Sequence, residues 1–232
     1  MNPQTQDRLD RWFAALERRH TSDLSFKELR RGLQALSAIY VERRETLTKG
    51  AALKGAGKRA AFALLYAPLH FAVTRHVVHE LGAASPAPTQ IYDLGCGTGA
   101  AGAAWAMEAR GKPSLTGVDL HPWAVEETRW TWGHFRLRGS VRRERLEQLR
   151  ISGRRPAVLI AFAINELEAE RREKVLVVEP IARRASPWWN GWAERFRAAG
   201  GRDDDWRFET GLPEEWRRLD RAYALSESGL WS

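Results

Sequence analysis

The chain has 232 residues, 44 % of them hydrophobic, which is enough for one ordinary domain with an extension and excludes wholesale disorder. Its net charge of +8 comes mostly from arginine, whose planar fork suits phosphate-bearing partners. The single cysteine excludes an internal disulfide and a cysteine-based metal cluster, and the polar N-terminus without a long apolar run predicts a cytoplasmic protein with no membrane partner.

The N-terminal part of the chain is predicted to be helical. Leu9, Trp12, Phe13 and Leu16 form one apolar stripe over residues 5–20. A capping box at Ser25 and Glu28 starts a second helix, from about residue 26 to 45, with Leu29, Leu33, Leu36 and Tyr40 at helical spacing. The basic stretch 48–59 is either a solvated loop or one that touches a phosphate backbone.

Two apolar helical segments, 59–66 and 68–81, are expected to follow, with a break near Pro68. Tyr66 or His70 is placed to close over a ligand, whereas the histidines at 70, 76 and 79 lack the partners of a metal site. The Gly- and Pro-rich stretch 82–88 is typical of a linker. We therefore divide the chain into a helical N-terminal extension, residues 1–85, and a cofactor-binding domain, residues 86–232.

The most informative stretch is 90–106. β-Formers at 91, 92 and 94 precede a turn with three glycines, and an alanine-rich run follows, so a strand, a tight turn and a helix are predicted. Such a turn exposes backbone N–H groups to a nucleotide-like ligand. The expected cofactor-binding residues of this stretch are Asp93, Gly95, Cys96, Gly97, Thr98 and Gly99.

Two ligands compete for this turn, because residues 97–102 also match the GxGxxG pattern of dinucleotide sites. Asp93 precedes the first glycine, and its carboxylate would repel a pyrophosphate but attract an ammonium and a sulfonium. We therefore favour S-adenosylmethionine over a dinucleotide, over a glycine turn without a ligand, and over a catalytic thiol at Cys96.

A second strand, 114–120, ends in Asp119 and Leu120 about 20 residues beyond the turn. An acid there can accept hydrogen bonds from both ribose hydroxyls, which supports a nucleoside under either interpretation. A helix over 122–135 with three tryptophans and a short strand near 140–142 are expected next. Residues 136–155 hold eight arginines, and we expect a basic face that binds RNA through Arg142, Arg143 and Arg145.

The apolar run 157–164 is typical of a strand buried on both faces, and Asn165 and Glu166 follow it. Ligands lie beyond the carboxyl ends of such strands, so these two residues are the candidate catalytic pair; Asn165 also belongs to the expected cofactor site. The Asn/Asp-Pro-Pro-aromatic signature of many amino-directed methyltransferases is absent. Another buried strand is expected over 174–180, then tryptophans and arginines over 183–197 that either stack bases or pack a helix, and finally an antiparallel pair, 205–208 with 225–231.

Several segments together resemble one family, the small-ribosomal-subunit methyltransferase-like proteins, which include mitochondrial assembly proteins and bacterial members. The resemblance runs from about residue 25 to the C-terminus, through segments 25–30, 40–44, 66–71, 93–106, 130–132, 165–167 and 178–180. It implies a Rossmann-like fold, S-adenosylmethionine binding, and ribosomal RNA or the small subunit as partner. Organellar relatives ligate an iron–sulfur cluster through extra cysteines that this chain lacks, and residues 181–184 replace the family's glycine-rich continuation.

The fold predicted from all these segments is α/β: a Rossmann-like class I methyltransferase with a mostly parallel sheet, helices on both faces and a helical N-terminal extension. The predicted function is methyl transfer from S-adenosylmethionine to RNA, with small-subunit ribosomal RNA as the leading acceptor, by holding the acceptor in line with the methyl. Two alternatives stay open: an assembly factor that binds the cofactor without turnover, and a small-molecule methyltransferase whose N-terminal helices form a lid.

Overall fold

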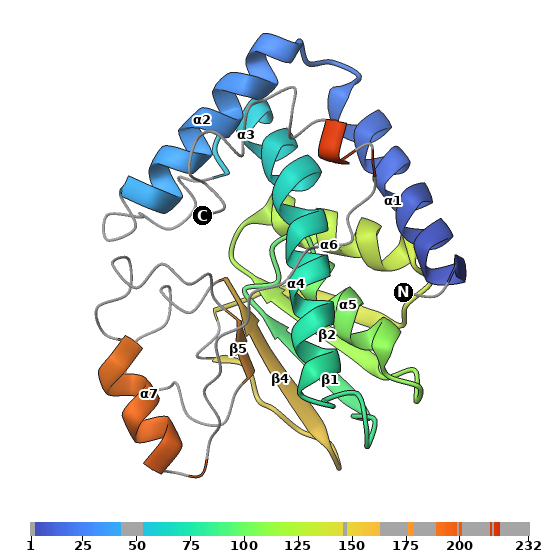
Figure 1. The fold of residues 1–232 in the computed structure, drawn as a ribbon, viewed down its shortest axis with the longest axis vertical. Coiled ribbons are helices and arrows are strands. Elements are labelled where there is room, and N and C mark those ends of the chain that lie inside the picture. Colours follow the sequence, from blue (N-terminus) through green and yellow to red (C-terminus); the bar gives the residue numbers. More distant parts are fainter. Residues whose placement is uncertain are drawn as a thin grey trace.

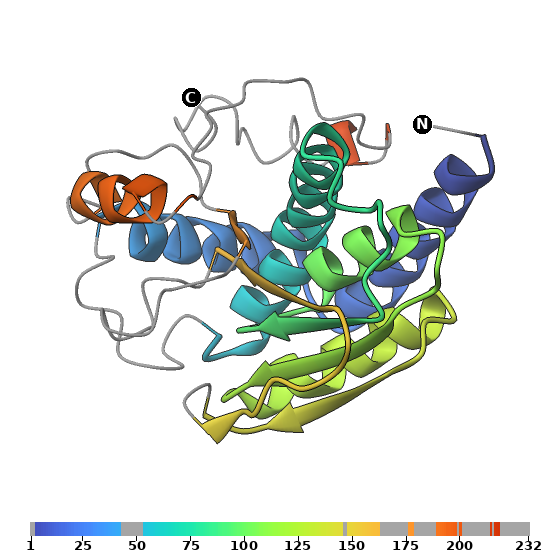
Figure 2. The same cartoon turned by 90° about the horizontal axis from the view of Figure 1, so that it is seen from below.

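The computed structural model describes residues 3–42, 53–145, 148–162, 176–178, 189–198, 200, 214 and 216–218. Its centre is a five-stranded sheet, with helices of the N-terminal half packed along it (Figures 1 and 2). The predicted strand pair 205–208 with 225–231, the side chain of Tyr40 and the candidate pair Asn165 and Glu166 lie outside the described residues.

The sheet has the strand order β3-β2-β1-β4-β5, and every pairing in it is parallel. The strands are β1 (Gln90–Leu94), β2 (Ser114–Asp119), β3 (Gly139–Arg143), β4 (Pro156–Ala161) and β5 (Leu176–Val178). β1 and β2, both buried at four or more positions, form the middle of the sheet with β4. This order is that of a doubly wound Rossmann-like sheet, with its switch point between β1 and β4, so the predicted α/β fold is confirmed.

Helices α5 (Ala100–Glu108) and α6 (Pro122–His134) cover the same face of this sheet. A Cβ on Gly117 would meet the Trp132 ring of α6 at 2.9 Å, and one on Gly102 of α5 would meet Asp93 Oδ2 at 2.5 Å. Asp93 and Gly117 are paired neighbours in β1 and β2, so both point to this face. On the opposite face the Tyr92 hydroxyl bonds the Ser152 carbonyl at 3.0 Å, which places the segment after β3 there.

The N-terminal helices pack into one core with α5 and α6. They are α1 (Pro3–Thr21), α2 (Phe26–Glu42), α3 (Ala56–Ala61) and α4 (Ala67–Glu80). Both predicted amphipathic helices are confirmed, and Glu28 Oε2 accepts hydrogen bonds from the Ser25 N–H at 2.9 Å and the Ser25 hydroxyl at 2.6 Å. A single hydrophobic cluster runs from Leu9 of α1 to Val141 of β3. The division of the chain at residues 85 and 86 stays a prediction, and the core is continuous across it.

The predicted break near Pro68 is wrong. Residues Phe62–Tyr66 form a π-helical segment that joins α3 to α4, so one continuous helix runs from Ala56 to Glu80. The proline ring would collide with the carbonyl four residues earlier in a regular helix, and a widened turn just before Pro68 accommodates it. By length and composition this helix could cross a membrane, but 67 % of its most apolar window is buried inside the protein, as in a core helix.

The remaining elements are shorter than predicted or only partly described. β4 ends at Ala161, because Phe162 has a positive φ of 61° that takes the chain out of the extended conformation. Helix α7 (Trp189–Ala198) covers part of the tryptophan- and arginine-rich stretch. Of the three tryptophans in the helix predicted over 122–135, Trp132 is a core residue, only 3 % exposed, as expected for at least one of them.

Candidate functional site

The glycine turn lies where the chain leaves β1 at the carboxyl edge of the sheet. Gly95, Gly97 and Gly99 have φ angles of 70°, 54° and 72°, a region that favours glycine, so the predicted turn is confirmed. A Cβ at position 99 would also lie 2.6 Å from the Thr128 methyl carbon of α6. Residue 99 therefore has to be glycine for two reasons, its backbone angle and its contact with α6.

Most backbone N–H groups of the turn already have acceptors inside the protein. The amides of Gly95 and Cys96 donate to the Val118 carbonyl, at 2.8 and 3.1 Å. The Gly99 amide donates to the Cys96 carbonyl at 2.6 Å, and the Gly97 amide donates to Asp119 at 3.0 Å. The turn is thus tied to β2 and to itself, which leaves few of its amides for an anionic ligand.

Two side chains of α6 hold the carbonyl side of the same turn. The Thr128 hydroxyl donates to the Gly97 carbonyl at 3.0 Å, and the Trp132 indole N–H donates to the Gly99 carbonyl at 2.9 Å. Both residues are almost completely buried. The position of α6 therefore fixes the position of the turn.

Asp93 lies beneath the turn, on the helix-covered face of the sheet. Its side chain is buried, and Oδ2 accepts a 3.0 Å hydrogen bond from the Gly102 amide in the first turn of α5. Burial raises the pKa of Asp93 to about 7; the Gly102 hydrogen bond opposes this rise and the neighbouring Asp119 charge adds to it. Asp93 therefore faces into the protein.

Gly102 is the third glycine of the GxGxxG match, and its role here is to make room for Asp93. A Cβ at this position would lie 2.5 Å from Asp93 Oδ2. Only glycine fits here, because any side chain would collide with the Asp93 carboxylate. In a dinucleotide site the third glycine serves the close packing of helix on strand.

Asp119 stands at the end of β2, beside the turn. Its Oδ2 accepts from the Gly97 amide at 3.0 Å, and its Oδ1 accepts from the His121 amide at 2.8 Å. Each carboxylate oxygen has further lone-pair capacity, so two hydroxyls of a ribose can still be bound. Burial raises the pKa of Asp119, against the effect of these two backbone hydrogen bonds.

Leu120 and His121 follow Asp119 directly. Leu120 is unusual among the large apolar side chains in being 38 % exposed, and its carbonyl accepts a 3.0 Å hydrogen bond from Arg143 Nε. The His121 Nδ1 is buried and has no hydrogen-bond partner within the described part of the chain. An exposed apolar surface and an unused ring nitrogen thus flank the carboxylate expected to hold the ribose.

Cys96 and Thr98 are both buried inside the turn, 6 % and 2 % exposed. The Cys96 sulfur lies 3.3 Å from the Thr128 hydroxyl oxygen. Burial raises the pKa of the Cys96 thiol well above its usual range, and Asp93 and Asp119 raise it further. A protonated, buried thiol is a poor nucleophile, which argues against catalysis by Cys96.

Four rings gather next to the turn. A Cβ on Gly97 would touch the Phe62 ring at 3.5 Å, and this ring is stacked on Tyr66 with centroids 5.6 Å apart. His70 lies edge-on to both, and it stacks on Phe162, just beyond β4, at 3.8 Å and 8°. Tyr66 and His70 thus belong to the ring group beside the turn, and their closing over a ligand stays a prediction. Burial raises the pKa of Tyr66 to about 12 and lowers that of His70 to about 3, so both are neutral near pH 7.

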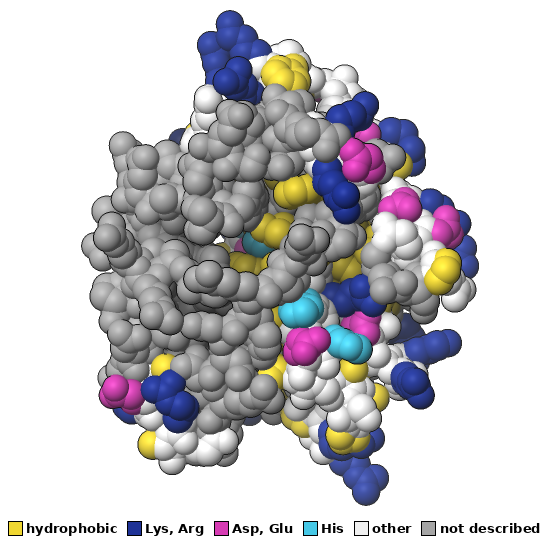
Figure 3. Space-filling model, viewed as in Figure 1, with side chains coloured by type: hydrophobic (Ala, Val, Ile, Leu, Met, Phe, Trp, Pro, Cys, Tyr) yellow, Lys and Arg dark blue, Asp and Glu magenta, His cyan; other side chains and the backbone are white. Residues whose placement is uncertain are grey.

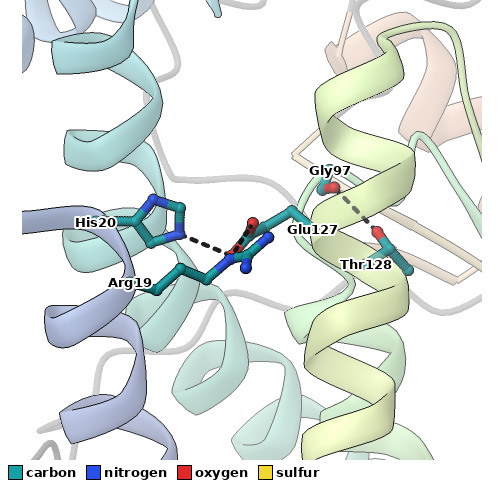
Figure 4. Close-up of polar contacts among 5 residues, drawn as sticks. All are labelled: Arg19, His20, Gly97, Glu127 and Thr128. Atoms are coloured by element: carbon teal, nitrogen blue, oxygen red, sulfur yellow. Dashed lines mark hydrogen bonds and ion pairs between the residues drawn. The ribbon is translucent and has the colours of Figure 1, made fainter. Parts of the chain in front are cut away.

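A buried carboxylate on α6 connects the N-terminal helix to this site (Figure 4). Glu127 is fully buried; its Oε2 lies 3.1 Å from Arg19 Nε and its Oε1 lies 2.8 Å from His20 Nε2, both at the end of α1. The next residue, Thr128, donates to Gly97 of the turn. Helix α1 is therefore clamped to the helix that positions the turn.

The arginines predicted to bind RNA lie on or just after β3, the edge strand of the sheet. Arg142, Arg143 and Arg145 are all exposed. The Arg143 side chain donates to the Leu120 carbonyl and so lies next to the candidate ribose site. Arg142 is paired in register with Val118, the residue before Asp119.

Sequence reasoning missed Phe62, Glu127, Thr128 and Trp132 as members of the site or its support. Their contacts join residues 31 to 108 positions apart, and no local pattern indicates them. His121 could have been found from the sequence, because it follows Asp119, the expected ribose-binding residue, by two positions.

No protein-family model and no curated protein matches the chain. Solved structures similar to it include the plantazolicin methyltransferase BpumL with a pentazolic desmethylPZN analog and SAH, at 16 % identity, 65 % of this chain, 55 % of that chain and a TM-score of 0.41. Another is the 16S rRNA methylase RmtB, at 15 % identity, 80 % of each chain and a TM-score of 0.39.

A third similar structure is the putative RNA methyltransferase PH1948 from Pyrococcus horikoshii, at 15 % identity, 60 % of this chain, 63 % of that chain and a TM-score of 0.33. The chain spans about half the length of the plantazolicin methyltransferase in its complex with SAH, 49 %. Likenesses this weak decide nothing about activity or substrate, and the fold is defined by the chain's own strand order and register.

Proposed function

We propose that this protein is an S-adenosylmethionine-dependent methyltransferase. The observation that carries the proposal is the pair of carboxylates at the glycine turn, Asp93 beneath it and Asp119 beside it, together with turn amides that are already bonded inside the protein. A pyrophosphate needs free amides and no neighbouring carboxylate. A ligand with an ammonium and a sulfonium gains from both acids.

The residues around the turn fit the parts of this cofactor. Asp119 would accept hydrogen bonds from the ribose hydroxyls, and the exposed Leu120 would pack against the adenine. Gly97 and Gly99 allow the ligand to approach the main chain, and Asp93 would favour the cationic methionine end through its field. When bound, S-adenosylmethionine supplies an electrophilic methyl group on sulfur. The contribution of the protein is then to hold the acceptor in line and to exclude water.

The rings of Phe62, Tyr66, His70 and Phe162 are suited to the acceptor side. They lie against Gly97 and at the end of β4, on either side of the switch point. Their π-faces can hold a planar group, and neither Tyr66 nor His70 carries a charge near pH 7. Asn165 and Glu166, which follow Phe162 by three and four residues, remain the proposed catalytic pair.

For the acceptor we propose RNA, and specifically the RNA of the small ribosomal subunit, which implies a cytoplasmic location. The exposed arginines of β3 next to the ribose site support RNA, and the sequence resemblance to the small-subunit methyltransferase-like family supports the ribosomal context. A small-molecule acceptor is the second candidate. It is favoured by the position of Phe62 and Tyr66, since these N-terminal residues lie over the turn as a lid would.

The deciding experiment is calorimetric titration of the purified protein with S-adenosylmethionine and, separately, with NAD. A transfer assay with labelled methyl groups on isolated small-subunit RNA follows it. Binding of S-adenosylmethionine alone, with label in RNA, is the expected result. Binding without label would favour the small-molecule enzyme or a cofactor-binding assembly factor, and binding of NAD alone would refute the proposal.

A further inference from the structure

A second group of arginines, apart from those of β3, lies where α1 packs on α6. We call it the α1–α6 surface. Its members are Arg8, Arg11, Arg18 and Arg19 from α1, and Arg129, Trp130, His134, Arg136 and Arg138 from α6 and the turn that follows it. Figure 3 shows Lys and Arg side chains along the side of the molecule formed by α1, with acidic side chains among them.

Several of these guanidinium groups are held in fixed positions. Arg8 donates to the Phe135 carbonyl at 2.6 Å and lies over the Phe135 ring, and Arg129 donates to the Val141 carbonyl at 2.9 Å. A guanidinium has five N–H donors, so one hydrogen bond to a carbonyl orients it and leaves the others for a ligand. Side chains oriented in this way lose less entropy when they bind a phosphate.

The cations converge on a pair of rings. Arg19 lies 5.1 Å over the Trp130 ring, and His134 lies 5.7 Å from the same ring. Burial lowers the pKa of His134, and the charges of Arg11, Arg8 and Arg18 lower it further. Arginines from three turns of α1 thus act electrostatically on one partly buried imidazole.

Acids pair with some cations of this surface, Arg19 with Glu127 at 3.1 Å among them. Within the described part of the chain, Arg18, Arg136 and Arg138 are exposed and form no ion pair with an acid. Arg11 pairs with Asp7 at 2.7 Å, but both side chains are more than half exposed. Such a pair contributes about 0–1 kcal/mol, so a phosphate can replace Asp7 at small cost.

We propose that the α1–α6 surface binds a single-stranded segment of RNA, with phosphates on its arginines and a base stacked near Trp130 and His134. The inference rests on the proposed RNA acceptor and gives the path by which RNA reaches the site. The arginines of α1 extend over residues 8 to 19, about 16 Å along the helix. The path ends at Arg19 and His20, which clamp the helix that holds the glycine turn.

The test compares salt dependence of binding for a labelled, single-stranded RNA of about 20 nucleotides and mixed sequence. The variant replaces three exposed arginines, Arg18, Arg136 and Arg138, by alanine; among the described residues these three form no ion pair. Each lost phosphate contact lowers the slope of log K against log salt by about 0.7, so we expect a slope smaller by about 2 and an affinity about 100-fold below that of the wild type at 0.1 M salt. Its matched control replaces three exposed cations of α2, Lys27, Arg30 and Arg31, and should leave the slope unchanged.

Calorimetry with S-adenosylmethionine on the same variants separates this inference from the proposed function. A reduced slope in the α1–α6 variant alone, with cofactor binding unchanged, supports the surface. The inference would be overturned by an unchanged slope, by an equal loss in the α2 control, or by a wild type that binds no RNA at 50 mM salt. In the last case the partner to test next would be an acidic protein. Absence of cofactor binding in the wild type would refute the methyltransferase and leave the RNA slope as an independent readout.

Discussion

Replacing Asp93 by Asn is expected to stabilise the fold above pH 7 and to weaken cofactor binding at the same time. In the folded protein burial raises the pKa of Asp93 to about 7, from an ordinary value of 3.8. Between these two values the folded state binds more protons than the unfolded state, so stability falls as pH rises from about 4 to 7. The difference of about three pKa units corresponds to roughly 4 kcal/mol of unfolding free energy. The wild type loses this stability as Asp93 ionises, whereas the Asp93→Asn variant keeps it.

The assay is urea unfolding of both proteins at pH 5 and pH 8. At pH 5 the wild-type carboxyl is mostly protonated, so an amide of the same shape changes little except that its NH2 group needs an acceptor. That constant cost cancels in the comparison of the two pH values. The Asp93→Asn variant should therefore gain about 3 kcal/mol relative to wild type on going from pH 5 to pH 8, because about two of the three pKa units lie within this range. An equal difference at both pH values would show that Asp93 is ionised at low pH and would refute the reasoning.

Cofactor binding should change in the opposite direction. A bound cation favours the carboxylate form of Asp93, so wild-type affinity for S-adenosylmethionine should rise relative to that of Asp93→Asn as pH goes from 6 to 8. The product SAH has an uncharged sulfur and should show a smaller difference between the two proteins. Higher stability with lower affinity is a combination that general damage to the fold would not produce.

Three other changes test the parts of the site separately. Asp119→Ala should lower S-adenosylmethionine affinity by about 10- to 100-fold in calorimetry, since hydrogen bonds to a charged group are lost, and unchanged affinity would mean that the ribose is bound elsewhere. Glu127→Ala should lower the free energy of unfolding in urea by about 2–3 kcal/mol. This is less than for a fully buried pair, because Arg19 is 39 % exposed. The control Glu126→Ala, on the exposed side of α6, should lower it by almost nothing. Replacing Arg142, Arg143 and Arg145, on and just after β3, together by Ala should reduce the salt slope of RNA binding by about 2 and leave cofactor affinity intact. Unchanged RNA binding would contradict a role for them.

The sequence was sufficient for the features that depend on neighbouring residues. Three closely spaced glycines after a run of β-formers predict a turn with positive φ, and all three have it. The capping box at Ser25 and the four buried residues of α1 follow from spacing alone. These elements were predictable because their determinants lie within one or two turns of chain.

Contacts between distant segments could not be predicted in this way. The direction of Asp93 depends on Gly102 nine residues later, whereas the sequence pattern showed only that an acid precedes the first glycine. A break was predicted near Pro68, but the chain stays helical there through a widened turn of buried apolar residues. The clamp between Glu127 and Arg19 joins residues 108 positions apart, and a glutamate near a helix start gives no sign of it.

Helix α6 is where these separate observations meet. Glu127 binds α1, Thr128 and Trp132 bind the carbonyls of the glycine turn, and Arg129 binds the edge strand β3. Since a helix moves as a rigid unit, a shift of α1 would be transmitted to the turn through less than two helical turns of α6. The N-terminal helices thus belong to the support of the cofactor site, and the proposed RNA path along α1 ends at the residues that hold this support in place.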